Sequence, residues 1–251
     1  MVNQIDLEHY INQLLASDGI QDYCPNGLQV AGKSEIKSIV CGVTACQALL
    51  EAAIEAQADA VIVHHGYFWR NESQPITGMK YERIKTLINH DLNLFAYHLP
   101  LDIHTTLGNN VTLARVLDIN VTHQEGADGI DNLLWFGELA IPKAGTAFSE
   151  HIAQALGREP LHIAGSDKMI QRVGWCTGGA QKYIDLAAKH VDAYITGEAS
   201  EGTVHSAREQ GVHFFAAGHH ATERYGVQAL GEHLAEKFDL TYQFIDIDNP
   251  V

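Results

Sequence analysis

Histidine is the residue type in this chain that most invites a chemical interpretation. The 251 residues include 15 histidines, and four of these form two adjacent pairs, His64–His65 and His219–His220. An imidazole ring is the commonest metal ligand in proteins, and it can also move protons near neutral pH. Both roles depend on neighbouring donors and on where the backbone places the ring, so the sequence around each histidine matters.

The first pair ends an apolar run, AVIVHHG (Ala60–Gly66), that is typical of a buried strand. Adjacent residues of a regular strand point to opposite faces of the sheet. Both rings can therefore serve one cluster only if the chain turns there, which Gly66 would permit. The alternative is a solvated pair of histidines at the end of a strand.

Two further motifs carry potential ligands. AGHHATE places His219 and Glu223 four residues apart at the predicted start of a helix, where such residues share one face. Glutamate in a first helical turn is also favoured by the helix dipole, so this pattern alone is ambiguous. YHLPLDIH supplies His98, Asp102 and His104 after another apolar run.

Taken together, the motifs predict a metal centre. Three separate strand ends each supply histidine or carboxylate, and a mixed set of about five nitrogen and oxygen ligands suits two divalent ions such as Fe, Mn or Zn. A carboxylate must bridge the ions, because two cations about 3.5–4 Å apart repel each other. Either Glu223 or Asp102 could be that bridge.

The hydrophobic pattern around these motifs predicts an α/β fold. A helix is expected over residues 4–17, and Ile36–Val43 and Val61–Val63 are expected as strands on either side of a helix that a Thr44–Gln47 capping box begins. This arrangement is a βαβ unit with a parallel sheet. Further helices are predicted around residues 84–88, where apolar residues have helical spacing, after a cap at Asn110, and at Phe148–Leu156. Further strands are predicted at Leu92–Tyr97, Leu133–Ile141 and Ile170–Cys176.

The second half of the chain resembles the first. A shift of 133 residues sets Val43–Gly66 against Cys176–Ala199, which places Asp59 opposite Asp192. The segment Leu92–Asp102 resembles Val212–Glu223 at a shift of either 120 or 121. We therefore predict two similar lobes, 1–125 and 126–251, with a linker at Gly126–Asp131 and a last strand that could join the first sheet. Ligands of such sheets bind at the carboxyl ends of the strands.

Composition limits the partners and the compartment. With 16 basic and 31 acidic residues the formal net charge is −15, which repels long nucleic acids and anionic membranes but leaves a small anionic substrate possible. The four cysteines form no CxxC pair, and a chain of this length needs no disulfides. No apolar run approaches 18 residues and no signal peptide is apparent, so we expect a cytoplasmic protein.

The same motifs, in order along nearly the whole chain, resemble the NIF-three-like family, whose bacterial members are often named type 2 GTP cyclohydrolase I. The segments that carry the resemblance are DYCPNGLQV, HHGYFW, YHLPLDIHTTLGNN, ITGE and AGHHATE. The resemblance implies a two-lobed NIF-three-like fold with a dinuclear metal cleft between the lobes, assembled as a ring-shaped homohexamer. The chain lacks the long domain that some relatives insert near its middle.

Carried over by position, the resemblance implies that His65 and Asp102 hold one metal, that His64 and His219 hold the other, and that Glu223 bridges them. The implied activity is hydrolytic opening of a purine nucleotide such as GTP, with water activated by two metals.

Three residues outside this ligand set, His98, His104 and Glu198, are expected to transfer protons. A phosphoesterase is the alternative enzyme. A metal-binding ring that acts as a regulator or interaction platform without turnover is the alternative of another class.

Overall fold

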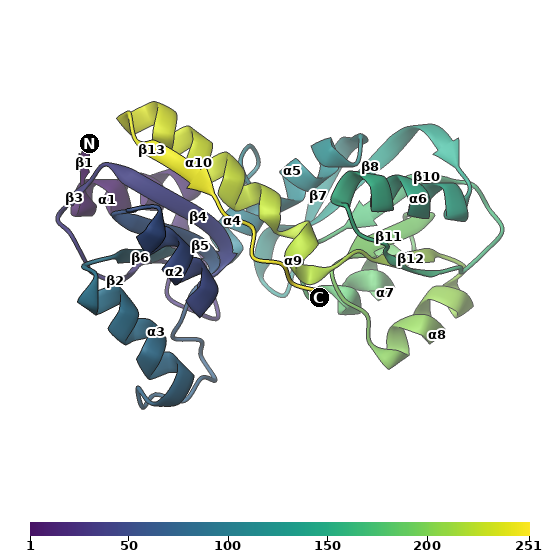
Figure 1. Cartoon of the computed structure of the whole chain (residues 1–251). Helices are drawn as coiled ribbons and strands as arrows, with labels where there is room; N and C mark the ends of the chain where they lie inside the picture. Colours follow the sequence, from purple (N-terminus) through teal and green to yellow (C-terminus); the bar gives the residue numbers. More distant parts are fainter. The chain divides into compact units, whose positions relative to one another are not determined.

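The structure is a computed structural model that describes all 251 residues, and these form two compact units. Unit 1 comprises Met1–Gly108 and Gly226–Asp248, drawn in purple to blue and in yellow in Figure 1. Unit 2 comprises Asn109–Tyr225 and Asn249–Val251. No helix in either unit combines the length and the apolar character that crossing a membrane would require.

Unit 1 is built on a five-stranded sheet of order β13-β4-β5-β6-β2, in which only β2 runs antiparallel to its neighbour. The strands of this sheet are β2 (Gly27–Val30), β4 (Ser38–Thr44), β5 (Ala60–His65), β6 (Asn93–Ala96) and β13 (Thr241–Phe244). Unit 1 also contains a separate antiparallel pair, β1 (Val2–Asn3) and β3 (Glu35–Ile36). Its helices are α1 (Gln4–Leu15), α2 (Gln47–Glu55), α3 (Gly78–Asn89), α4 (Leu99–Ile103) and most of α10 (Arg224–Phe238), with a 3-10 turn at Ser17–Gly19.

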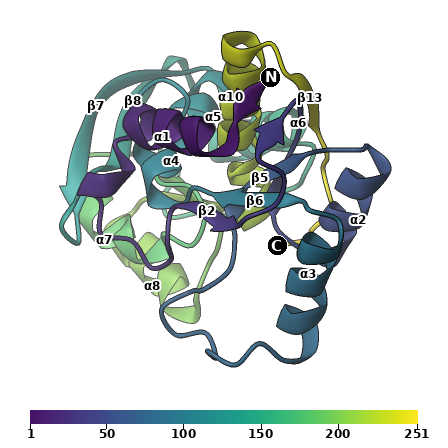
Figure 2. The same ribbon diagram turned by 90° about the vertical axis from the view of Figure 1, so that its left-hand side faces the viewer.

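Both faces of this sheet are covered, because successive side chains of its strands alternate between two cores. Ile39 of β4 and Ile62 of β5 pack in a cluster with residues of α1 and α10. Val40 and Val61, their immediate neighbours along the strands, pack in a second cluster with residues of α2 and α3. Figure 2 shows these two helix pairs on opposite sides of β5 and β6. Burial on both faces explains why the strands are continuous apolar runs.

Unit 2 is built on a six-stranded sheet of order β7-β8-β10-β11-β12-β9, in which β10, β11 and β12 are parallel and the other pairs are antiparallel. Its strands are β7 (Ile119–Ala127), β8 (Ile130–Lys143), β9 (Leu161–Ile163), β10 (Ile170–Trp175), β11 (Ala193–Thr196) and β12 (His213–Ala216). Its helices are α5 (Asn109–Val116), α6 (Gly145–Leu156), α7 (Ile184–Ala187), α8 (Glu201–Gln210) and α9 (His219–Thr222), with a 3-10 turn at Gln181–Tyr183.

The two units share a common plan, which confirms the predicted pair of similar α/β lobes. Each has three consecutive parallel strands with helical connections, and the third of these pairs with an antiparallel edge strand, β2 or β9. Ala60 pairs with Asn93 in unit 1, and Ala193 pairs with His213 in unit 2. This register settles the shift for the third strand at 120 residues.

The boundaries of the units differ from the predicted lobes of 1–125 and 126–251. The first crossing falls after Gly108 because Leu113 and Leu117, in and just after α5, pack in the core of unit 2 against Trp135. Near the other end, Gly226–Asp248 returns to unit 1, where Leu230 of α10 is buried in the core and β13 extends the sheet beside β4.

Two local expectations from the sequence are wrong. The expected linker at Gly126–Asp131 is the tight turn of the β7–β8 hairpin, where Asp128 and Gly129 both take positive φ (52° and 80°), as a two-residue turn requires. The capping box at Thr44 does not form, because α2 begins after Cys46 without a side-chain cap. The Thr44 hydroxyl instead lies 3.1 Å from Nδ1 of His65.

Asp59 and Asp192, which the repeat places opposite each other, have the same structural role. Each carboxylate accepts hydrogen bonds from two backbone N–H groups of a neighbouring strand start and forms an ion pair, with Lys33 at 2.6 Å or Arg172 at 2.8 Å. Burial acts to raise the pKa of both carboxyls, but these contacts outweigh it and the pKa of each is lowered. Both aspartates therefore stabilise the folded state in their ionised form.

This role predicts how stability depends on pH. A carboxyl whose pKa is lower in the folded than in the unfolded chain contributes stability above the unfolded pKa of about 3.9, and this is lost as pH falls through the folded pKa. We expect Asp59→Asn and Asp192→Asn each to lower the free energy of unfolding by about 1–2 kcal/mol at pH 7. The difference from wild type should shrink at pH 3 in urea unfolding. The exposed Glu209→Gln is the control, and a difference independent of pH would contradict the assignment.

Candidate metal centre

The first histidine pair lies at the carboxyl end of β5 in unit 1. Both residues belong to the strand, and the ring centroids of His64 and His65 are 4.5 Å apart, so the two imidazoles lie side by side without the expected turn. Gly66 was expected to permit a turn, but in the structure it is required by the close approach of neighbouring side chains. A Cβ there would lie 2.6 Å from that of Ala96 and 2.2 Å from the Gln29 amide oxygen, so only glycine fits.

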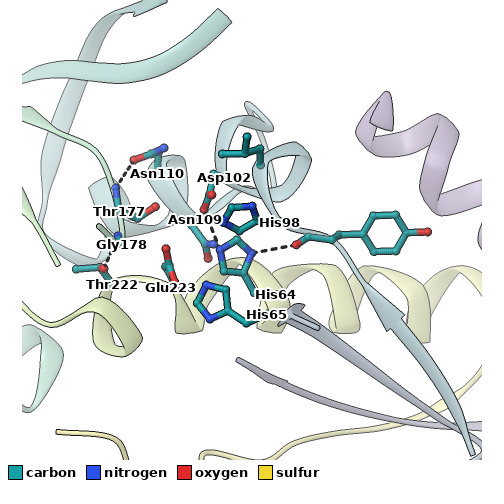
Figure 3. A network of polar contacts seen from close by, with 12 residues as sticks. His64, His65, His98, Asp102, Asn109, Asn110, Thr177, Gly178, Thr222 and Glu223 are labelled. Atoms are coloured by element: carbon teal, nitrogen blue, oxygen red, sulfur yellow. Dashed lines mark hydrogen bonds and ion pairs between the residues drawn. The ribbon is translucent and has the colours of Figure 1, made fainter. Parts of the chain in front are cut away.

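His64 is buried and its orientation is set by the backbone. Its Nδ1 lies 2.9 Å from the carbonyl oxygen of Tyr97, and because a carbonyl only accepts, Nδ1 must carry the ring proton (Figure 3). The lone pair is then on Nε2, which lies 3.3 Å from Oδ1 of the buried Asp102 on α4. Metal-binding histidines commonly donate their other N–H to a backbone carbonyl in this way.

His98 joins this group from the loop between β6 and α4. One donor atom each of His64, His65 and His98 can lie within 4.8 Å of the others. The ring of His98 also meets the indole of Trp69 edge-on, with centroids 4.9 Å apart. Trp69 therefore packs against this cluster of histidines.

Asp22 holds His98 in place, a role that sequence reasoning missed. Its two oxygens accept from Nδ1 of His98 at 2.7 Å, from the side chain of Asn26 and from the backbone N–H groups of Tyr23 and Leu99. Burial acts to raise the pKa of Asp22, but the contact with His98 and these bonds lower it. Four donors occupy the carboxylate, so it positions His98. The only signal in the sequence was its place in DYCPNG, which is dominated by turn-forming residues.

In unit 2, His219 lies between two carboxylates. Its Nδ1 is 2.6 Å from Oε1 of Glu198, and its Nε2 is 3.2 Å from Oε2 of the buried Glu223. Burial acts to lower the pKa of His219, but the hydrogen bonds and charges of Glu223 and Glu198 raise it to about 9. At neutral pH a proton on His219 thus balances the charge of the two carboxylates. A metal cation bound at Nε2 would balance that charge in the same way.

The loop after β10 seats Glu223. Gly178 has a φ of +67°, and a Cβ there would lie only 2.0 Å from Oε1 of Glu223. The N–H of Gly178 donates to the Thr222 hydroxyl and that of Thr177 donates to the Asn110 side chain, both at 3.1 Å (Figure 3). These hydrogen bonds hold the loop in place, and the absence of a side chain at Gly178 leaves room for the Glu223 carboxylate.

His104, which the sequence offered for proton transfer, has other partners. Its Nδ1 accepts from the backbone N–H of Leu107 at 3.1 Å, and its ring also bonds the backbone at Leu14. Burial lowers its pKa. Both contacts give His104 a structural role at the end of α4, and it is absent from the groups of potential metal donors.

Each unit thus supplies donors of the kind that divalent transition metals accept. Unit 1 gathers His64, His65, His98 and Asp102, and unit 2 gathers His219 and Glu223 with Glu198 behind them. Imidazole nitrogens mixed with carboxylate oxygens fit Fe, Mn or Zn, and each of these histidines is oriented by a further partner. The donor chemistry therefore suits the expected metals.

Comparison with known proteins extends over the whole chain. The Duf34/NIF3 (NGG1p interacting factor 3) family profile matches residues 2–250. A protein of Vibrio cholerae serotype O1 named GTP cyclohydrolase 1 type 2 homolog is 58% identical, with 100% of both chains covered.

Two solved structures agree with this match. The protein named ybgI, described as of unknown function, aligns with a TM-score of 0.96 at 54% identity, and TTHA1606 from Thermus thermophilus with 0.87 at 32%, each covering 100% of both chains. These matches confirm the resemblance found in the sequence: the chain belongs to the Duf34/NIF3 family.

Proposed function

We propose that this protein is a dinuclear metal-dependent hydrolase that acts on a purine nucleotide, as the name of its Vibrio cholerae relative suggests. The observation that carries the proposal is the state of the imidazoles. The ring proton of His64 is held on Nδ1 by a carbonyl, and that of His219 faces the Glu198 carboxylate, so the Nε2 atom of each is directed at a carboxylate. Histidines prepared in this way are typical of metal centres.

The proposed ligands are those that the family resemblance implied. His65 and Asp102 would hold one ion, His64 and His219 the other, and Glu223 would bridge them, which requires the donors of both units to bind the same pair of ions. Such ions lower the pKa of water and stabilise negative charge on a substrate. Five protein ligands for two ions would leave positions open, which favours an enzyme over a closed structural site.

The remaining residues have supporting roles in this proposal. His98, which Asp22 orients, is the group we assign to proton transfer, because its ring adjoins His64 and His65. Glu198 holds His219 through Nδ1 and therefore positions a ligand. His104, bound to the backbone, has no part in the chemistry.

Metal content and turnover, measured on the same preparations, test the function. We expect about two divalent ions per wild-type chain, clear loss of metal in Glu223→Gln, and full metal in Glu201→Gln, which removes an exposed carboxylate of α8. His98→Ala should keep its metal and lower turnover of GTP or another purine nucleotide by roughly 10²–10⁴-fold. Two bound metals without turnover of any nucleotide or phosphoester would favour the non-enzymatic ring.

Proton release on metal binding tests the role of His219. Because its pKa is raised to about 9, the metal-free protein carries this proton at pH 7.5, and a metal must displace it. Calorimetry of metal binding in buffers of different ionisation enthalpy should show that release. Glu198→Gln removes one of the carboxylates that raise the pKa, so fewer protons per metal should leave. Equal release in both proteins would contradict His219 as a ligand.

Assembly into a ring of six chains is the expected quaternary state, and it follows from the family resemblance. Light scattering at micromolar concentration should give a mass about six times the 27.5 kDa of one chain. A monomer under these conditions would remove the ring from the proposal while leaving the metal ligands unaffected.

A further inference from the structure

Unit 2 contains an open cavity of about 600 Å³ at the carboxyl ends of two parallel strands. Gly197–Ala199 follow β11, Ala216 ends β12, and the segment Arg158–Leu161 closes the side toward β9. Small ligands of α/β sheets bind at this end of the strands. The cavity is also large enough for a nucleotide-sized molecule.

One wall of the cavity belongs to the proposed metal centre. Glu198 lines it, and the same carboxylate is 2.6 Å from Nδ1 of His219. A molecule that occupies the cavity is therefore adjacent to the residue that holds a proposed ligand.

Arg158 is the basic residue among those that line the cavity, and its half-buried side chain is in ion-pair contact with none of the acidic groups there. Its Nε is buried and has no hydrogen-bond partner, and its guanidinium forms no ion pair. The formal net charge of the chain is −15, so nearly twice as many acidic as basic side chains are available for pairing. An arginine that remains unpaired in such a chain is suited to bind an external anion.

The backbone makes room for this guanidinium. Gly218, which precedes His219, has a φ of +101°, and a Cβ added there would lie 2.8 Å from Nε of Arg158. Glycine is therefore required both by its conformation and by the close approach of the arginine. The acidic groups that line the cavity are Glu159, Glu198 and the C-terminal residue Val251. Glu198 is hydrogen-bonded to His219, Glu159 and Val251 are exposed, and none of the three forms an ion pair with the guanidinium.

We infer that Arg158 is the anion-binding residue of the substrate site and binds the phosphate of an organic phosphate ester in this cavity. The planar guanidinium fits phosphate oxygens in a bidentate arrangement, which the ammonium of lysine cannot reproduce. The inference rests on the proposed function and extends it: the phosphate contact with Arg158 would align the base of the nucleotide. Arg158 would then determine specificity for phosphorylated over unphosphorylated substrates.

Binding of guanosine 5′-monophosphate and of guanosine, measured by calorimetry in phosphate-free buffer, tests this role. Wild type should bind the monophosphate at least tenfold more tightly than the nucleoside, and Arg158→Gln should remove that difference. Arg158→Lys, which keeps the charge, should retain part of it. The matched control is Arg208→Gln, which removes the same charge from the exposed end of α8 and should behave as wild type.

Because phosphate can also bind metals, each protein should be measured both as purified and after metal removal. Dependence on Arg158 in both states supports the inference, and unchanged metal content in Arg158→Gln shows that the metal centre is intact. An equal preference for the monophosphate in wild type and Arg158→Gln, or no preference in wild type, would overturn it. If wild type contains no metal as purified and still shows the Arg158 dependence, the proposed metal centre is refuted and the inference about Arg158 stands.

Discussion

An imidazole can offer a lone pair to a cation only when its other nitrogen holds the proton, and the structure around the candidate metal centre is organised to meet this condition. The Tyr97 carbonyl does so for His64, and Glu198 faces the corresponding nitrogen of His219. These partners lie at the ends of parallel strands or directly after them, where side chains can gather while the strands remain buried on both faces. The two sheets therefore determine where the residues of the candidate metal centre lie.

The structural repeat places different residues of the candidate metal centre at equivalent positions of the two units. His65 ends β5, and Glu198, its counterpart at a shift of 133, follows β11. Thr44, which contacts His65, is opposite Thr177 in the loop beside Glu223. Equivalent backbone positions thus carry a proposed metal donor in one unit and the residue that orients a proposed donor in the other.

The residues before the short helices α4 and α9 show the same division of roles. His98 precedes α4 and is held by Asp22, whereas Gly218, its equivalent at a shift of 120, precedes α9 and is small enough to admit Arg158. The side chain at the first position, His98, is the group that we propose for proton transfer. The absence of a side chain at the second position, Gly218, leaves space for the Arg158 guanidinium beside the cavity of unit 2.

Periodicity and local motifs were sufficient to predict the α/β class and the repeat, because burial on two faces leaves direct traces in a sequence. The histidine motifs indicated the candidate metal donors. The sequence alone could not distinguish a linker from a two-residue hairpin at Asp128–Gly129, nor a helix cap from a histidine partner at Thr44, because each residue type serves both purposes. Asp22, Glu198 and Arg158 acquire their roles only from residues distant in the chain or from the space around them. Tertiary structure decides such roles because a hydrogen-bond partner or an unpaired charge is a property of the neighbourhood, which a linear pattern does not contain.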